Sequence, residues 1–265
     1  MTGAGGIAPG RDAAAARPPA GSAPVTGGLV DRIRAGLRSA AEPERAAGMQ
    51  RYMRSAMPYL GVRLPVVRTV VRSCAASMDP GASGRASPHL PDLRNVPDLP
   101  DLLAAATTLW REAGVREERY AATELLALRP ARGRVEALPL VTEVIVTGAW
   151  WDHVDAVAPR VGAMLLDHPA VIEPVVRSWS RDADRWLRRA SIICQLAARE
   201  RTDRGLLTDV VDANLADPEF FVRKAIGWAL RQYARTDPAW VLAFVAGRRD
   251  LLSPLSYREA VKHLS

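Results

Sequence analysis

The strongest constraint on the fold is a pair of similar segments, residues 184–197 (DRWLRRASIICQLA) and 219–234 (EFFVRKAIGWALRQYA). When Arg188 is aligned with Arg223, both segments show an aromatic residue, an apolar residue, two cations, an alanine and then a helical apolar run. The offset is about 35 residues, and a period in the thirties with two helices per unit is typical of α-solenoids. The sequence therefore predicts an all-α stack of HEAT-like repeats with a concave inner surface, in preference to an irregular helical domain.

Two segments rich in glycine and proline border the predicted helices. Residues 1–27 have little apolar surface to bury, so we expect a disordered tail there. Residues 79–100 are dense in proline and glycine, which predicts a long loop. The repeat domain is therefore expected over residues 28–265. Within it, residues 138–148 (LPLVTEVIVTG) fit either a short strand or a buried helix.

The charge balance favours an anionic partner. The chain of 265 residues carries a net charge of +7, which suits nucleic acid or a membrane surface, although a solvated basic surface is the simpler alternative. Because no run of about 18 apolar residues is present, we expect no transmembrane helix. The N-terminus lacks the apolar region of a signal peptide, so we expect a cytoplasmic protein.

Cysteine content and known catalytic signatures exclude several kinds of site. The two cysteines, Cys74 and Cys194, are far apart and predict neither a disulfide framework nor a zinc site. We expect each to be a small buried apolar residue in a reducing compartment. Nucleophile-elbow, Walker and zinc-protease motifs are absent from the sequence. We therefore expect no metal and no other cofactor.

Two tryptophans and two aspartates stand together in residues 148–159 (GAWWDHVDAVAP). Trp150 and Val154 begin one apolar stripe of a helix, which predicts that Trp150 lies in the core. Trp151 and Asp155 are also four residues apart, on a face rotated by about 100°. They are expected to project together from a face outside the centre of the core. A half-buried tryptophan beside a solvated aspartate is the alternative without function.

The other two polar residues of this stretch are not expected to do chemistry. Asp152 stands near the predicted helix start, where a carboxylate favours the helix dipole or caps the helix. His153 has no partner at metal-ligand spacing. We therefore expect Asp152 to be structural and His153 to lie on the surface.

A second unusual helix face lies in the last repeat-like segment. Lys224, Trp228 and Arg231 follow each other at i, i+4 and i+7, and Phe220 precedes them by one turn. A tryptophan between two cations suits contact with a sugar–phosphate backbone, through charge and through aromatic surface. The alternative is that Trp228 fills a gap between repeats.

Three arginines cluster in the preceding segment. Arg185, Arg188 and Arg189 occupy spacing i, i+3 and i+4, so they share one helix face. Such a cluster is usually a solvated basic face. On the inner side of a solenoid it would instead clamp phosphate groups.

These segments resemble the AlkD-like DNA alkylation repair family, which consists of HEAT-repeat DNA glycosylases. The likeness runs in order from about residue 46 to the C-terminus. The segments that carry it are 51–68 (RYMRSAMPYLGVRLPVVR), 150–159 (WWDHVDAVAP), 184–203, 219–241 and 252–264. The resemblance implies an α-solenoid with a concave basic groove for DNA, and so agrees with the repeat pattern.

The resemblance also implies roles for single residues. Trp151 and Trp228 match the aromatic residues that pack against the deoxyribose of the damaged nucleotide, and Asp155 matches the catalytic carboxylate. Further residues match groups that hold the DNA or line the same cleft: Tyr52, Arg68, Arg189, Phe220, Phe221 and Arg231. Lys224 joins this DNA-binding set because it shares a helix face with Trp228.

The function implied is hydrolysis of the N-glycosidic bond of cationic N-alkylated purines, 3-methyladenine and 7-methylguanine. The substrate would be duplex DNA, held without flipping the base, and the enzyme a monomer that joins the nucleoid when it acts. The first alternative is a HEAT-repeat protein that binds DNA without catalysis. The second is a scaffold that binds other proteins, as many solenoids do.

Overall fold

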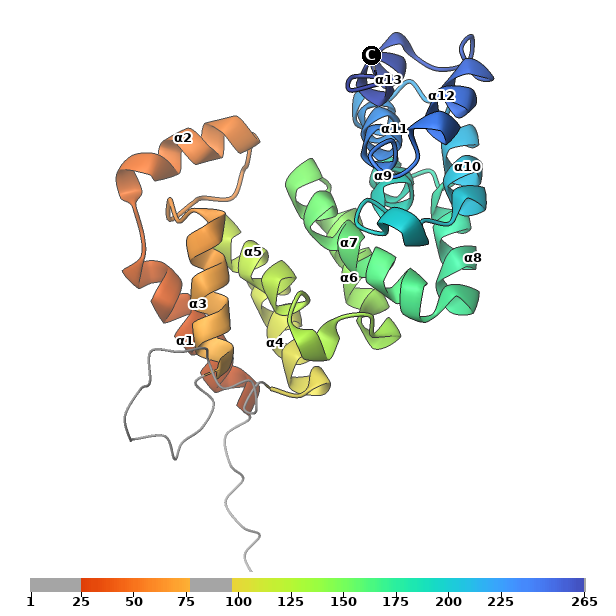
Figure 1. Ribbon diagram of the computed structural model, residues 1–265. Coiled ribbons are helices and arrows are strands. Elements are labelled where there is room, and N and C mark those ends of the chain that lie inside the picture. The colour runs from red at the N-terminus through yellow and green to blue at the C-terminus, as the bar shows by residue number, and fades with distance from the viewer. Residues whose placement is uncertain (1–24, 77–96, 265) are drawn as a thin grey trace, which may run out of the picture.

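The computed structural model of the protein describes residues 25–76 and 97–264 (Figure 1). These residues form thirteen α-helices and three short 3-10 helices without any strand, which confirms the all-α prediction. The α-helices are α1 (Val25–Ser39), α2 (Pro43–Met53), α3 (Leu64–Ala76), α4 (Leu99–Arg111), α5 (Arg116–Leu125), α6 (Leu138–Gly148), α7 (Trp151–Asp167), α8 (Pro169–Trp179), α9 (Arg185–Ile193), α10 (Arg204–Asp212), α11 (Phe220–Tyr233), α12 (Pro238–Ala246) and α13 (Pro254–Ala260). The 3-10 helices are η2 (Arg129–Ala131), η3 (Val135–Ala137) and η4 (Arg199–Arg201).

The helices repeat with the period that the sequence predicts. Helices α5, α7, α9, α11 and α13 begin at Arg116, Trp151, Arg185, Phe220 and Pro254, so successive starts lie 34 or 35 residues apart. Each of these helices packs against the next one, and α3 packs against α5, which makes a continuous row. The intervening helices α4, α6, α8, α10 and α12 cover this row, since each packs against a member of it. The protein is therefore a solenoid of helical repeats.

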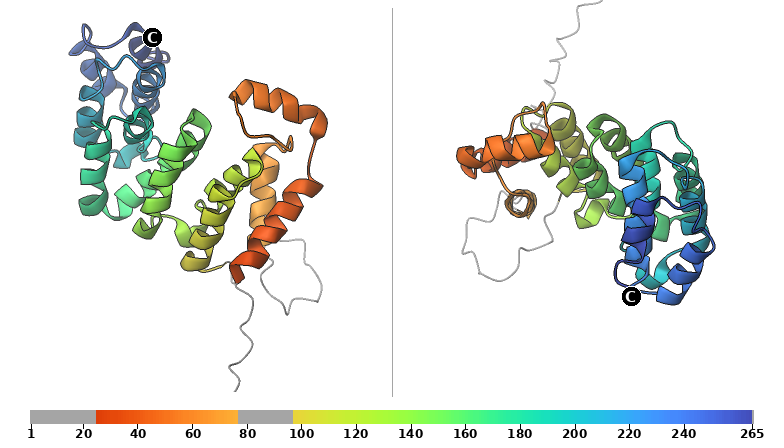
Figure 2. Two further views of the ribbon diagram at one scale, coloured as in Figure 1. Left: turned by 180° about the vertical axis from the view of Figure 1, so that it is seen from behind. Right: turned by 90° about the horizontal axis from the view of Figure 1, so that it is seen from above.

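The array of helices is bent. Figure 1 shows α2 at one end and α13 at the other, both standing on the same side of the array, with α5 and α7 between them. The view from behind in Figure 2 shows the same bend. The bend brings residues from distant parts of the chain to one side of the molecule.

A buried carboxylate fixes the chain between α2 and α3. Glu117, at the start of α5, accepts hydrogen bonds from the backbone N–H groups of Leu60, Gly61 and Val62 at 2.9 to 3.1 Å. Gly61 has a φ of 87°, a conformation that favours glycine. These bonds satisfy amides that burial would otherwise leave unpaired. They anchor the connection that carries α2, and with it Tyr52, onto the row of helices.

Helices α7 and α9 approach each other closely at Gly162. A Cβ atom at this position would overlap the carbonyl oxygen of Cys194. Cys194 is buried, as expected, whereas Cys74 is only half-buried, and both thiols are free. A glycine at residue 162 therefore sets how near the two helices can come.

The predicted tail and loop fall mainly outside the described residues. Residues 25–27, assigned to the tail from the sequence, lie in the first turn of α1. Leu99 and Pro100, assigned to the 79–100 loop, begin α4, where the N-cap residue Asp98 accepts a hydrogen bond from the N–H of Asp101. Residues 138–148 form α6. In the described part of the chain, each helix is too short or too polar to cross a bilayer.

Candidate active site

Trp151 and Asp155 occupy the first turns of α7 and face one cavity. Trp150 is the N-cap residue with an extended backbone, so the helix begins at Trp151 and places Asp155 one turn further on. The cavity has a volume of about 400 Å³ and is lined mainly by apolar atoms. We call it the cleft. Its walls are Met49, Tyr52 and Met53 from α2, Leu64 and Arg68 from α3, Tyr120 and Thr123 from α5, and Trp151, Asp152, Asp155 and Ala156 from α7.

Asp155 is held by a two-pronged ion pair with Arg189. The Nε and Nη2 atoms of Arg189 donate to the two carboxylate oxygens of Asp155, each at 2.8 Å. Arg189 is 4% exposed, and its Nη1 donates to the carbonyl oxygen of Phe221 at 2.7 Å. The guanidinium carbon also lies 5.9 Å from the centre of the Trp228 ring. Arg189 thus joins the carboxylate on α7 to the tryptophan on α11.

The environment of Asp155 makes its carboxylate a stronger base than usual. Burial raises the pKa of Asp155 above its ordinary value, and the nearby charge of Asp152 raises it further. The bonds from Arg189 act in the opposite direction and offset only part of this effect. A carboxylate that is desolvated, oriented and basic is suited to stabilise positive charge or to accept a proton from water.

Asp152 lines the same cleft but is held much more completely. Arg116 donates to both of its oxygens at 2.8 to 3.0 Å, and the hydroxyl of Tyr120 donates to Oδ2 at 2.7 Å. The backbone N–H of His153 donates to Oδ1 at 2.9 Å. Burial acts to raise the pKa of Asp152, but the interactions with His153, Arg116 and Tyr120 outweigh it and lower that pKa. Asp152 lies in the first turn of α7, as expected, but it does not cap the helix and instead forms an ion pair between α5 and α7.

His153 does not lie on the surface, and the expectation from the sequence was wrong. Its side chain is 0% exposed, with its ring edge-on to Trp110 at 4.9 Å and tilted against Tyr120 at 5.5 Å. Burial lowers the pKa of His153 to about 3, so the imidazole is neutral. The reason for the error is that His153 shares a helix stripe with buried Val157, four residues on.

Two cations on α11, Lys224 and Arg231, are paired with one carboxylate. Glu259, on α13, accepts a hydrogen bond from the Nζ of Lys224 at 3.0 Å and also pairs with Arg231. The hydrogen bond from Lys224, followed by the charges of both cations, holds the pKa of Glu259 below its usual range. Sequence reasoning missed Glu259, which lies 35 residues after Lys224, one repeat along the chain.

The aromatic residues form one cluster beside the ion pair. Phe221 packs against the rings of Trp150, Trp186 and Phe220 with centroid distances of 5.5, 5.0 and 5.3 Å. Trp150 is half-buried against the core rather than inside it, because it precedes the helix whose stripe it was expected to join. Phe220 remains 54% exposed. The cluster supports the backbone of Phe221, whose carbonyl oxygen orients Arg189.

The remaining predicted residues lie at the rim of the cleft or in ion pairs. Tyr52 is 76% exposed, and Arg68 donates from Nε to Glu124 Oε1 at 2.9 Å. Each arginine of the cluster on α9 is paired: Arg185 with Glu219, Arg188 with Asp217, and Arg189 with Asp155. These three side chains are therefore neither a purely solvated face nor free cations.

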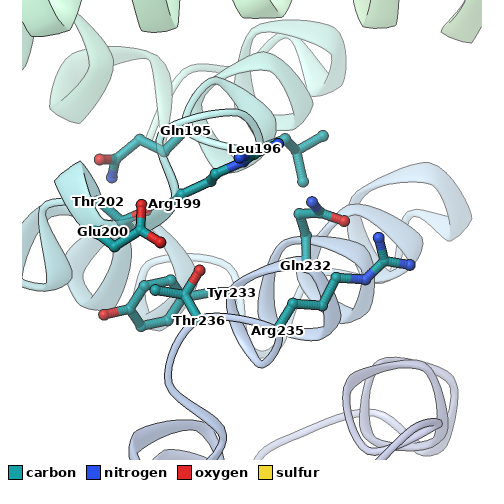
Figure 3. Close-up of a pocket in the computed structure, with 9 residues that line it drawn as sticks. All are labelled: Gln195, Leu196, Arg199, Glu200, Thr202, Gln232, Tyr233, Arg235 and Thr236. Carbon is teal, nitrogen blue, oxygen red and sulfur yellow. The ribbon is translucent and has the colours of Figure 1, made fainter.

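Another pocket, of about 290 Å³, lies at the C-terminal ends of α9 and α11 (Figure 3). It is mostly polar, with Gln195, Arg199, Tyr233 and Arg235 among the side chains that surround it. None of the predicted site residues lines it. Among the described residues, no group of three or more His, Cys, Asp or Glu side chains is placed to hold a metal ion. The cleft on α7 is therefore the candidate active site.

The fold and the site together define a helical-repeat protein in which an aspartate–arginine ion pair lies near two tryptophans. The family model described as DNA alkylation repair enzyme matches residues 33–264, and the chain belongs to this family. A predicted DNA alkylation repair enzyme from Enterococcus faecalis is similar in structure, with a TM-score of 0.63 and 26% sequence identity over 85% of this chain and 97% of that chain. No curated protein matches the chain. The protein therefore has a role in DNA repair, with DNA as its substrate.

Proposed function

We propose that the protein is a DNA glycosylase that hydrolyses the N-glycosidic bond of cationic N-alkylated purines, chiefly 3-methyladenine and 7-methylguanine. The observation that carries this proposal is the ion pair between buried Arg189 and partly buried Asp155, beside Trp151 and Trp228. The pair orients a carboxylate toward a cleft that is large enough for part of a nucleotide. Family membership supports DNA repair, and the site supports this particular reaction.

The chemistry of the substrate matches these side chains. Alkylation at N3 or N7 makes the purine a cation and a good leaving group, so no acid is needed to protonate it. As the bond to C1′ breaks, positive charge develops on the sugar. The indole faces of Trp151 and Trp228 attract this charge, and the carboxylate of Asp155 stabilises it. Asp155 also accepts the hydrogen bond that orients water toward C1′.

We further propose that the bent side of the array, between α2 and α13, forms the concave basic groove for duplex DNA. Tyr52 and Arg68 on the cleft wall would contact the backbone from one end of the groove. Phe220, Phe221, Lys224 and Arg231 would contact it from the other end. The damaged base would stay stacked while the protein grips the deoxyribose, and one chain would supply the whole site.

The decisive experiment compares wild type with Asp155→Asn on a methylated duplex. Release of 7-methylguanine is measured in single turnover, with DNA affinity measured alongside. The variant should bind DNA but release the base about a hundredfold to a thousandfold more slowly, as found when one transition-state partner is removed. Asp250→Asn, an exposed carboxylate far from the cleft in sequence, is the matched control and should retain the wild-type rate.

Two outcomes would replace the proposal with an alternative. Wild type that binds DNA yet releases no N-alkylated purine would be a binding protein without this activity. Wild type whose binding to a partner lacks the steep salt dependence of phosphate contacts would instead support a protein scaffold.

A further inference from the structure

A third cavity, of about 210 Å³, lies between the end of α5, the second half of α7 and the turns that follow α9. Three of its lining side chains are arginines: Arg132, Arg160 and Arg201. The other described residues that line it are small or apolar, and none of them carries a negative charge. We call this cavity the arginine pocket. A concentration of guanidinium groups on a small apolar surface favours an anion.

The positive charge of Arg160 is not balanced by a carboxylate of its own among the described residues. Burial lowers the pKa of Arg160, and the charges of Arg68 and Arg132 lower it further. Glu124 acts in the opposite direction, but it already accepts a hydrogen bond from Arg68. Among the described residues, the buried Nε of Arg160 has no hydrogen-bond partner. A guanidinium stays charged in proteins. A buried Nε–H without an acceptor therefore costs free energy, and a bound anion would remove that cost.

The arginines at the neighbouring site are satisfied in a different way. Arg116 has Asp152, Arg189 has Asp155, and Arg231 has Glu259 as an internal carboxylate partner. Arg160 lies on the same row of helices, and none of the described carboxylates forms an ion pair with it. The arginine pocket is thus a place where the fold leaves a partly buried cation open to an external anion.

The pocket continues the cleft along the same helix faces. On α7, Asp155 lines the cleft, while Pro159 and Leu166, at i+4 and i+11, line the pocket. Thr123 in α5 lines the cleft, and Ala127, four residues on and just after α5, lines the pocket. Arg160 lies about 7.5 Å along the axis of α7 from Asp155 and about 140° around it, so it lines the pocket from beside that face. Two nucleotide steps of DNA rise by about 6.8 Å along the duplex axis.

We propose that the arginine pocket binds a backbone phosphate of the DNA duplex whose damaged nucleotide lies at the cleft. This inference rests on the proposed function, because it takes DNA to lie over α7. The phosphate oxygens accept hydrogen bonds from Arg160, and Arg132 and Arg201 contribute charge from the exposed rim of the pocket. Arginine suits this role because its planar fork matches the geometry of phosphate.

The first test measures binding to an undamaged duplex as a function of salt concentration. Arg160→Gln and Arg132→Gln are each compared with wild type by fluorescence anisotropy. Each variant should reduce the slope of log K against log salt by about 0.9, the loss of one phosphate contact, and bind about five- to tenfold more weakly at low salt. Arg129→Gln is the matched control, because Arg129 is exposed on the same turn as Arg132 but does not line the pocket.

A second test locates the phosphate. Neutral methylphosphonate linkages are placed one at a time along both strands around the damaged nucleotide. At one linkage, wild type should lose affinity while Arg160→Gln loses none, because the variant has already given up that contact. A thermal melt of Arg160→Gln should match or exceed wild type, since a partly buried cation without an ion-pair partner among the described residues is removed.

The outcomes separate this inference from the proposed function. Wild-type slopes in both variants, or no linkage that distinguishes wild type from Arg160→Gln, would overturn the arginine pocket even if the protein releases methylated purines. Wild type that releases no such base but shows the expected slopes would overturn the glycosylase and leave the pocket in place.

Discussion

The first turns of α7 hold two partly buried carboxylates, and their surroundings act on them in opposite ways. Asp152 receives hydrogen bonds from Arg116, Tyr120 and the backbone, and its pKa is lowered. Asp155 receives its hydrogen bonds from Arg189, and its pKa is raised. The surroundings of Asp152 stabilise its negative charge, whereas those of Asp155 leave its carboxylate more basic than usual. One helix turn thus separates an ion pair that joins helices from the ion pair for which we propose a catalytic role.

The largest effect should appear when each carboxylate is replaced by its amide. Asp152→Asn leaves Arg116 buried without a charged partner, which should lower the free energy of unfolding by about 3–5 kcal/mol. Asp155→Asn also leaves a buried arginine, Arg189, without its carboxylate, but the loss should be smaller, because the raised pKa of Asp155 means that the folded state disfavours its charge. Urea denaturation of both variants measures the difference. An equal loss of unfolding free energy in the two variants would contradict the difference between Asp152 and Asp155.

The next effect concerns the fork that orients Asp155. Arg189→Lys keeps the charge but loses the two parallel hydrogen bonds, so Asp155 should turn away from its working position. Base release should slow by about tenfold to a hundredfold in single turnover, a loss of about 1.4–2.8 kcal/mol of transition-state stabilisation. Arg185→Lys is the matched control, since it changes a half-exposed pair with Glu219 on the same helix. A wild-type rate for Arg189→Lys would contradict a positioning role for the fork.

The two carboxylates should also differ in their dependence on pH. Because the folded-state pKa of Asp155 is raised above 3.8, base release should fall at a pH higher than an ordinary aspartate would give. Between the unfolded-state and folded-state pKa values of Asp155, the native state binds more protons than the unfolded state. The free energy of unfolding therefore falls as the pH rises through this range. The folded-state pKa of Asp152 is lowered below 3.8. Asp152 therefore adds to the free energy of unfolding above pH 3.8, and this addition is lost as the pH falls through the folded-state pKa.

A pH–rate profile and acid unfolding curves measure these two effects. Asp152→Asn should flatten the acid loss of stability below about pH 4. A rate that stays constant down to that pH would show that the basicity of Asp155 plays no part in the reaction.

The smallest effect is expected at Glu259, which is an ion-pair partner like Asp152 but pairs with two cations, Lys224 and Arg231. Glu259→Gln should release Lys224 and Arg231 toward phosphate and raise affinity for duplex DNA about two- to fivefold at low salt, with a steeper salt dependence. Anisotropy titrations at two salt concentrations measure it, and Glu200→Gln is an exposed control. Unchanged affinity would mean that the two cations face away from bound DNA.

The sequence was sufficient for whatever depends on spacing along the chain. The offset between residues 184–197 and 219–234 predicted the repeat, and the four-residue spacing predicted that Trp151 and Asp155 share a face. Roles for single residues depended on the resemblance to a family, and they remain proposals.

What the sequence could not supply was the identity of partners on other helices. Nothing in the local sequence distinguishes Arg116, Tyr120 and Glu259 from exposed polar residues. Their partners lie on α7 and α11, and only the packing of the helices brings them together. The ion pairs nevertheless follow the repeat: their separations are 36 residues for Arg116 and Asp152, 34 for Asp155 and Arg189, and 35 for Lys224 and Glu259. A search for opposite charges one period apart would have found them.

The close approach of α7 and α9 at Gly162 has a consequence for the site beyond packing. Asp155 stands on one of these helices and Arg189 on the other, so the gap between acid and guanidinium is an inter-helix spacing. Gly162 allows the short spacing between α7 and α9 because it has no Cβ atom, and it lies two turns away from Asp155 and outside the cleft. The alignment of Asp155 with Arg189 therefore depends partly on a residue that has no side chain and lies outside the cleft.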